Sequence, residues 1–181
     1  MKTKLISLTL ALALTQWNSE AQIVSAGLSH TLVACTSGSY QACGYNYSGQ
    51  LGDNTTTNRV TPVQVNSIAQ VTGIAAGSFH SLAVKQNGTV WSWGYNVYGQ
   101  LGDGTTTDHL APTQIPHLAG VTAISAGEYI SMALRNDSTV WCWGNNSWGQ
   151  LGNGTFSANP NPTPVRVSTL TGIVEIGRAH V

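Results

Sequence analysis

Charged side chains are scarce in this chain of 181 residues. Asp, Glu, Lys and Arg together make up 8% of it, against about 25% in ordinary soluble domains. Seven basic residues balance seven acidic ones, and without the first 21 residues the balance is five against six. A net charge this close to zero provides no basic surface for a phosphate backbone or an anionic membrane. We therefore expect no nucleic acid among the partners.

The chain also lacks a long apolar run at its beginning, where a membrane anchor would lie. The largely apolar run Leu5–Leu14 has ten residues, well short of the roughly 18 that indicate a transmembrane helix. It follows Lys2 and Lys4 and precedes a polar segment that ends in a small-x-small sequence. This order is typical of a secretory signal peptide. We expect cleavage before Gln22, and a mature chain without a membrane span that is secreted or held at the cell surface.

Cysteine is rare and odd in number. Cys35, Cys43 and Cys142 do not make a disulfide framework, and no metal-ligand spacing occurs. We expect Cys43 and Cys142 to be buried apolar thiols. Cys43 should lie opposite Thr31 or Leu32 across a hairpin, which leaves Cys35 too far along the strand for a disulfide. Neither a metal nor a cofactor is predicted.

Glycine, in contrast, is abundant and marks a repeat of fifty residues. The segment Trp91–Thr105 reads WSWGYNVYGQLGDGT, with a close copy at Trp141–Thr155 and a weaker one at Gln41–Thr55. A period in the range of about 20–50 residues indicates a solenoid, a propeller or another repeat array.

The second copy predicts four short strands. Val71–Ala76 is apolar, Ser81–Lys85 alternates, and an Asn-Gly hairpin signal leads into Thr89–Trp93. Pro112–Ile115 is expected to be an edge strand, where proline is tolerated. Four antiparallel strands in fifty residues correspond to one propeller blade. The predicted fold is all-β, a partial β-propeller of about three four-stranded blades that is open because the chain is incomplete.

The repeat also predicts the division of the chain. We expect a signal peptide at residues 1–21, blades at 22–72, 73–122 and 123–174, and at 175–181 either the start of a fourth repeat or a sequencing artefact.

The third strand of each blade explains why such blades stack. Trp91 and Trp93 form a bulky face, whereas Val90 and Ser92 form a slim one. Large side chains facing small ones let neighbouring sheets interdigitate, so each blade depends on its neighbours for stability. The first copy departs from this pattern, because Cys43 and a glutamine replace its tryptophans.

Positions that are constant between the copies are expected to build the scaffold. They include the Gly-Gln-Leu-Gly tetrads that begin at Gly49, Gly99 and Gly149, and the loop residues Asn46, Asn96 and Asn146. Glycine permits left-handed turns, leucine anchors the loop, and asparagine caps backbone groups. His30 and His80 also match, but the third copy has Ile130 there, so we interpret the histidine as structural rather than catalytic.

Three sequences in the second copy resemble a known repeat. They are Gly77-Ser-Phe-His-Ser-Leu-Ala-Val, Gly88-Thr-Val-Trp-Ser-Trp-Gly-Tyr-Asn and Gly99-Gln-Leu-Gly-Asp-Gly-Thr. They are similar to the regulator of chromosome condensation repeat family, and the resemblance extends over Gln22–Ile176. It implies a β-propeller. The founding member is a nuclear exchange factor for a Ran-type GTPase and a chromatin binder, whereas a secreted bacterial member inhibits β-lactamases by protein–protein contact. Because one fold serves unrelated functions, activity does not follow from the resemblance.

Positions that vary between the copies fall in two loops, and an up-and-down blade brings these loops to the same end. We expect an extracellular binding module for a protein or a glycan, without catalysis, since exposed aromatic residues suit binding surfaces. For any single residue the alternative is simple packing between loops. The predicted partner-binding residues are Phe79, Tyr98, Glu128, Tyr129 and Trp148.

Two other function classes stay open. A secreted enzyme, for example a carbohydrate-active one, would need a carboxylate pair or a nucleophile with a base. Asp53 and Asp103 are repeat equivalents that Asn153 replaces in the third copy, so such an enzyme would carry its catalytic residues in missing repeats. A guanine-nucleotide exchange factor is the other alternative, and it would require that residues 1–21 are not a signal peptide. No catalytic, cofactor-binding or metal-binding residue is predicted.

Overall fold

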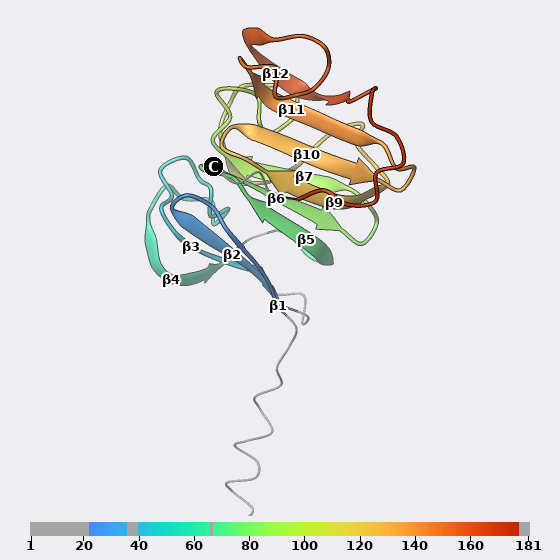
Figure 1. Cartoon of the computed structure of the whole chain (residues 1–181). Coiled ribbons are helices and arrows are strands. Elements are labelled where there is room, and N and C mark those ends of the chain that lie inside the picture. Colours follow the sequence, from blue (N-terminus) through green and yellow to red (C-terminus); the bar gives the residue numbers. More distant parts are fainter. Residues whose placement is uncertain (1–21, 36–39, 66, 178–181) are drawn as a thin grey trace, which may run out of the picture.

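A computed structural model describes residues 22–35, 40–65 and 67–177 (Figure 1). The expected signal peptide, the turn of the first hairpin and residues 178–181 lie outside the described residues. In the described part, no helix is long and apolar enough to cross a membrane.

The described strands form three antiparallel sheets of four strands, each built from consecutive strands. The first sheet contains β1 (Gln22–Ala26), β2 (His30–Cys35), β3 (Tyr40–Gly44) and β4 (Arg59–Gln64). The second contains β5 (Val71–Ala76), β6 (His80–Lys85), β7 (Val90–Gly94) and β8 (His109–Gln114). The third contains β9 (Val121–Ala126), β10 (Ile130–Arg135), β11 (Val140–Asn146) and β12 (Ser157–Arg166). The prediction of an all-β fold with three open four-stranded blades is confirmed.

The outer strand of the second blade is longer than the sequence predicted. The prediction of an edge strand at Pro112–Ile115 was too short, because β8 begins at His109 and pairs there with Gly94. A register shift between Ser92 and Gly94 lets this pairing continue to the loop. Such a bulge leaves no mark in the alternation of residue types.

The register of the first hairpin decides the position of Cys43. Cys43 lies opposite Thr31, one of the two predicted partners. It is half-buried, so the expectation of a buried thiol was wrong for Cys43 and correct for Cys142. The face of the first sheet that carries Cys43 has no sheet packed against it in the described residues.

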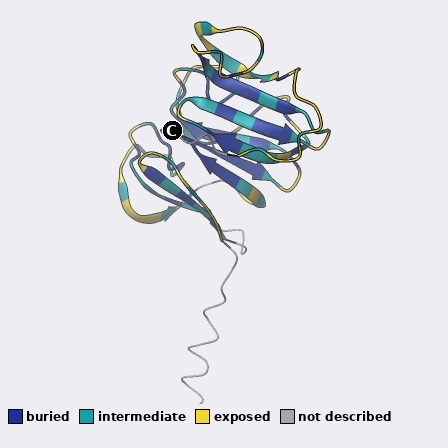
Figure 2. Cartoon of the chain, viewed as in Figure 1, coloured by how far each residue is buried: buried dark blue, intermediate teal, exposed yellow. Residues whose placement is uncertain are grey.

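Neighbouring sheets interdigitate as the two faces of the third strand predicted. Trp93 packs into the first sheet, in a core that includes Leu32 and Tyr40. Val90, on the opposite face, belongs to the core between the second and third sheets, where Trp143 takes the place of Trp93. Figure 2 shows burial concentrated in the inner strands, with exposure on β4, β12 and the loops.

The first strands of the blades lie next to one another, with β1 against β5 and β5 against β9. The hydroxyl of Ser25 on β1 accepts a hydrogen bond of 3.0 Å from the backbone N–H of Ala76 on β5. Ser125 on β9 donates in turn to the carbonyl oxygen of Gly177 at 2.8 Å. The segment after β12 therefore runs beside β9 in the way that β9 runs beside β5.

Candidate partner-binding surface

Strand pairing brings two loops of each blade together. In the second sheet, His80 pairs with Gly94, so the turn before β6 adjoins the long loop after β7. The backbone N–H of Tyr95 donates to the carbonyl of Phe79 at 2.9 Å, and Tyr45 and Asn145 make the same bond in the other blades. We call this side of the sheets the loop end, and the side with the turns at 86–89 and 136–139 the hairpin end.

An asparagine holds each long loop in shape. Asn96 is fully buried, and its Oδ1 accepts from the N–H of Leu101 at 2.9 Å. Its Nδ2 donates to the carbonyls of Thr105 and Thr107 at 3.2 and 3.0 Å. Asn46 makes the equivalent bonds, which confirms the prediction that these residues build the scaffold.

The acidic residues of the loops also serve structure. Asp53 lies 2.8 Å from Arg59, and Asp103 lies 2.6 Å from His109. Burial alone would raise the pKa of Asp103, but hydrogen bonds from Thr105 and His109 outweigh it and hold the pKa below its ordinary value. These carboxylates are engaged in loop contacts and do not form a pair.

The repeated histidine joins two blades. His80 is fully buried, and its Nε2 lies 2.9 Å from Oγ of Ser131 in the next blade. Because Ser131 donates its own proton to the carbonyl of Gln100 at 2.7 Å, the serine accepts from His80 Nε2–H. Burial, helped by the charge of His30, lowers the pKa of His80 to about 3. The structural interpretation of this histidine is confirmed.

Aromatic side chains meet at the loop end across all three blades. Tyr98 and Tyr129 have ring centroids 4.8 Å apart, and Phe79 stacks on Tyr129 at 6.4 Å. Tyr95 lies 6.1 Å from Tyr129, and Tyr45 lies 6.2 Å from Phe79. With Tyr47, which is 4.8 Å from Tyr45, these rings form one continuous set. We call it the aromatic cluster: Tyr45, Tyr47, Phe79, Tyr95, Tyr98 and Tyr129.

The aromatic cluster is only partly buried, since five of its residues are half-buried and the sixth is exposed. None of its rings belongs to the buried core, and Tyr47 is 68% exposed. Partial burial, the Glu128 charge and the neighbouring tyrosines raise the pKa of Tyr129. Partial burial, Tyr98 and the Asp108 charge raise the pKa of Tyr95. Both hydroxyls are therefore neutral at physiological pH, and that of Tyr129 interacts with the carboxylate of Glu128.

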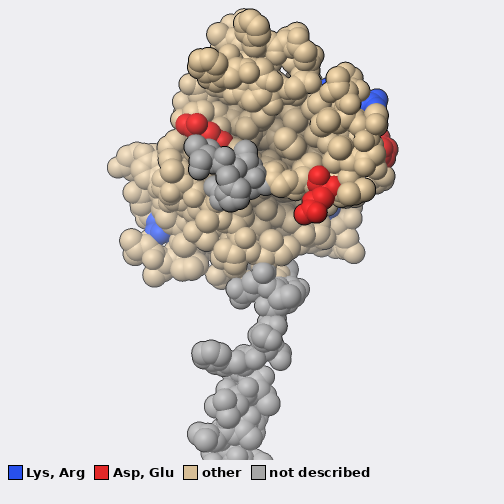
Figure 3. Space-filling view, in the orientation of Figure 1, with Lys and Arg blue, Asp and Glu red and all other residues tan. Residues whose placement is uncertain are grey.

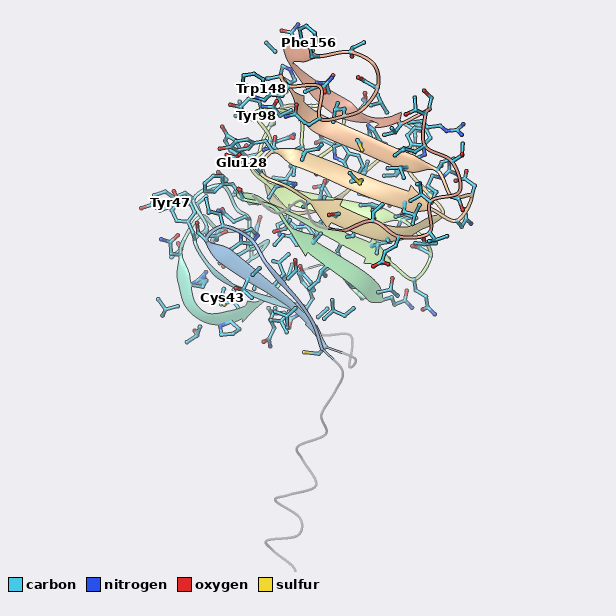
Figure 4. All side chains as sticks on the ribbon, in the orientation of Figure 1. Cys43, Tyr47, Tyr98, Glu128, Trp148 and Phe156 are labelled. Carbon is cyan, nitrogen blue, oxygen red and sulfur yellow. The ribbon has the colours of Figure 1, made fainter. Side chains whose placement is uncertain are left out.

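The structure brings most of the predicted binding residues together. Phe79, Tyr98 and Tyr129 share the aromatic cluster, and Glu128 is exposed beside Tyr129. Trp148 is 91% exposed and makes no ring contact with the described residues. Figure 4 shows Tyr47, Glu128, Tyr98, Trp148 and Phe156 along the same side of the molecule, away from Cys43.

Sequence reasoning missed two rings at the centre of the cluster. Tyr45 and Tyr95 occupy the same position in two copies, and identity between copies was taken to indicate scaffold. Phe156, which is 81% exposed at the same end, precedes the irregular β12 and has no aromatic equivalent in the other copies. A search for large apolar residues in both loops, whether repeated or not, would have found all three.

The family of the chain follows from its repeats. The sequence matches the regulator of chromosome condensation (RCC1) repeat at residues 38–84, 87–134 and 137–179. A second description of the same repeat matches residues 71–100 and 121–150. Comparison with curated proteins finds no match.

Solved structures of similar fold are larger than this chain. Human WBSCR16 is 27% identical with a TM-score of 0.71, covering 80% of this chain and 39% of its own. Prp20p from Saccharomyces cerevisiae, described with its binding to Gsp1p and histones, is 21% identical with a TM-score of 0.71, covering 80% and 37%. Yeast RCC1 (Prp20) bound to Kap60 is 21% identical with a TM-score of 0.73, and the match covers 80% of this chain and 36% of the yeast chain. The similarity thus spans well under half of each of these chains. The three blades and the three repeat matches show that this chain belongs to the regulator of chromosome condensation repeat family.

Proposed function

We propose that this protein is an exported interaction module that binds another protein through its loop end. The observation that carries the proposal is the aromatic cluster, which is continuous over three blades and partly exposed to solvent. Aromatic anchors surrounded by small residues are typical of the energetic centre of an interface.

The loops that carry these rings are held in place before any partner arrives. Asn96 fixes one long loop through its bonds to Leu101 and Thr107. The hydrogen bond from Tyr95 N–H to Phe79 joins that loop to the turn. A surface whose backbone is already ordered loses less entropy on binding, so more of the contact energy appears as affinity.

A protein is favoured as the partner because similar propellers are described with protein partners. Prp20p is described with Gsp1p and histones, and yeast RCC1 with Kap60. Those partners belong to those proteins, and what carries over is the class of partner. Catalysis is less well supported, because Asp53 and Asp103 are already engaged with Arg59 and His109.

Site-specific photo-cross-linking in the cells that produce the protein tests the proposal. A photoreactive phenylalanine analogue would replace Tyr47 or Trp148 at the loop end, which are 68% and 91% exposed. The control position is Asn87, which is exposed in a turn at the hairpin end. Far-UV circular dichroism would confirm that each variant is folded.

We expect one protein species to be cross-linked from Tyr47 and Trp148 and not from Asn87. Cross-links from Asn87 alone, or none from either loop position, would overturn the proposal. If the loop-end positions cross-link to a glycan and to no protein, the partner is a glycan and the protein part of the proposal is wrong.

Export is a separate part of the proposal and has its own test. The apolar run Leu5–Leu14 after two lysines is the feature that supports it. Material collected outside the cell should begin at Gln22 in N-terminal sequencing. Protein that retains Met1 and stays inside the cell would contradict export.

A further inference from the structure

Most of the described lysine and arginine side chains lie at the hairpin end, where Asp137 is 3.6 Å from Arg135. Lys85 and Arg135 are the last residues of β6 and β10, so they lie at the hairpin end. Arg166 lies there too, because it pairs with Trp141 near the start of β11. Arg59, the arginine described at the loop end, forms an ion pair with Asp53, with 2.8 Å between Nη2 and Oδ2.

Carboxylates, in contrast, border the aromatic cluster. Glu128 is exposed and comes immediately before Tyr129 in the turn. Asp108 closes the long loop, where its Oδ1 accepts from the N–H of Asn96 at 2.8 Å. Among the described residues, neither carboxylate has a lysine or arginine within salt-bridge distance. Figure 3 shows few charged groups on the face of the molecule in view.

Two tryptophan rings of this chain make cation–π contacts with basic side chains. At the hairpin end, Nζ of Lys85 lies 5.2 Å from the ring centroid of Trp91, and Cζ of Arg135 lies 5.8 Å from that of Trp141. At the loop end, no described lysine or arginine lies over the rings of Tyr98 or Tyr129. A cation over an aromatic face gains more where the site is partly desolvated, and a nearby carboxylate strengthens the attraction.

We propose that the loop end selects a cationic segment of its protein partner, with an arginine or lysine side chain over Tyr98 and Tyr129 and beside Glu128. This inference rests on the proposed function, because it names the chemistry of the partner at the same surface. Arginine suits the position especially well, since its planar guanidinium stacks on tyrosine and pairs with a carboxylate at once.

Selection of random dodecapeptides displayed on phage tests the inference, since the library itself supplies the candidate ligands. The bait is the purified protein, and each recovered clone is compared on the protein and on the double variant Tyr98→Ala/Tyr129→Ala. The matched control is Val60→Ala, which removes a fully exposed apolar side chain outside the aromatic cluster. We expect clones that lose binding on the double variant, and not on the control, to be enriched in arginine and lysine and depleted in aspartate and glutamate.

The outcomes separate the two proposals. Clones that need Tyr98 and Tyr129 but carry no excess of basic residues would overturn the cationic partner and leave the loop end as a binding surface. Clones that bind the double variant as well as the parent, or no enriched clones at all, would overturn both.

Glu128→Gln provides a second readout that a loss of folding does not mimic. It removes the exposed charge and keeps the shape of the side chain. Affinity for a basic clone should fall about threefold to tenfold at about 50 mM NaCl, and the difference should shrink at about 300 mM, where exposed charges are screened. An affinity that is equal for Glu128 and the Gln variant at low salt would contradict the inference.

Discussion

The indole N–H of Trp93 reaches across to the neighbouring blade. It donates to the carbonyl of Gln50 at 2.9 Å, and Ser81 donates to the same oxygen at 2.7 Å. Trp143 repeats the bond with Gln100 at 2.9 Å. The tryptophan therefore joins two sheets both by apolar burial and through a hydrogen bond.

Trp93→Ala should lower the free energy of unfolding by about 3–5 kcal/mol, the usual cost of removing a buried aromatic ring. Trp148→Ala is the matched control, and because its ring is 91% exposed it should change stability by at most about 0.5 kcal/mol. Chemical denaturation measures both. Equal losses of unfolding free energy in the two variants would show that the stability of the three sheets does not depend on the core between blades.

His80 makes stability depend on pH. Its folded pKa of about 3 lies below the ordinary histidine value of about 6.5, so the unfolded chain binds the proton first. The stabilising contribution is complete above about pH 6.5 and falls, by up to about 1.4 kcal/mol per pH unit, as the pH drops towards 3. His80→Ile, which copies Ile130 of the third blade, should flatten the loss between pH 7 and 4 relative to the parent. An unchanged pH profile would contradict a neutral buried histidine.

The loop of one blade closes against the tryptophan of the next. A Cβ atom at Gly102 would lie 2.6 Å from Nε1 of Trp143, whereas one at Gly104 would meet no atom within 4 Å. Both glycines have positive φ, of 73° and 86°. Alanine at either position therefore has similar backbone strain, and the difference between the two variants isolates the contact between blades.

Gly102→Ala should be less stable than Gly104→Ala by at least about 1–3 kcal/mol, as expected for overpacking in a tight core. Thermal or chemical unfolding of the two variants measures the difference. Equal stability would mean that Trp143 has room to move away from the loop.

The strands were predictable because the three copies of the repeat can be compared with one another. The Asn-Gly turn and the alternation around Leu82 locate β6 and β7 within one residue of their observed bounds. The start of β8 was not predictable, since the shift after Ser92 depends on how the strand meets the loop and not on residue type. Tyr45 and Tyr95 were missed for a related reason: a residue that repeats can serve both the scaffold and the surface.

As a whole, the described molecule is three blades with one aromatic, acid-bordered end and one end of tight turns that carries Lys85 and Arg135. Sequence reasoning placed the variable, aromatic loops at one end because strand connectivity alone fixes which loops share an end, but it did not predict the charges at the two ends. The ring contacts depend on the distance between blades, and no pattern within one repeat encodes that distance. Tyr98 and Tyr129 come from neighbouring blades and yet lie 4.8 Å apart.

The affinity of the cross-linked partner for the fourfold variant Phe79→Ala/Tyr98→Ala/Tyr129→Ala/Trp148→Ala tests the binding surface most directly. We expect a loss of at least about 100-fold, because hot-spot aromatics contribute about 2 kcal/mol or more each. The melting temperature should fall less than in Trp93→Ala, since none of the four residues belongs to the buried core. An affinity within threefold of the parent, or a fourfold variant that unfolds before Trp93→Ala does, would contradict the assignment of the loop end as the binding surface.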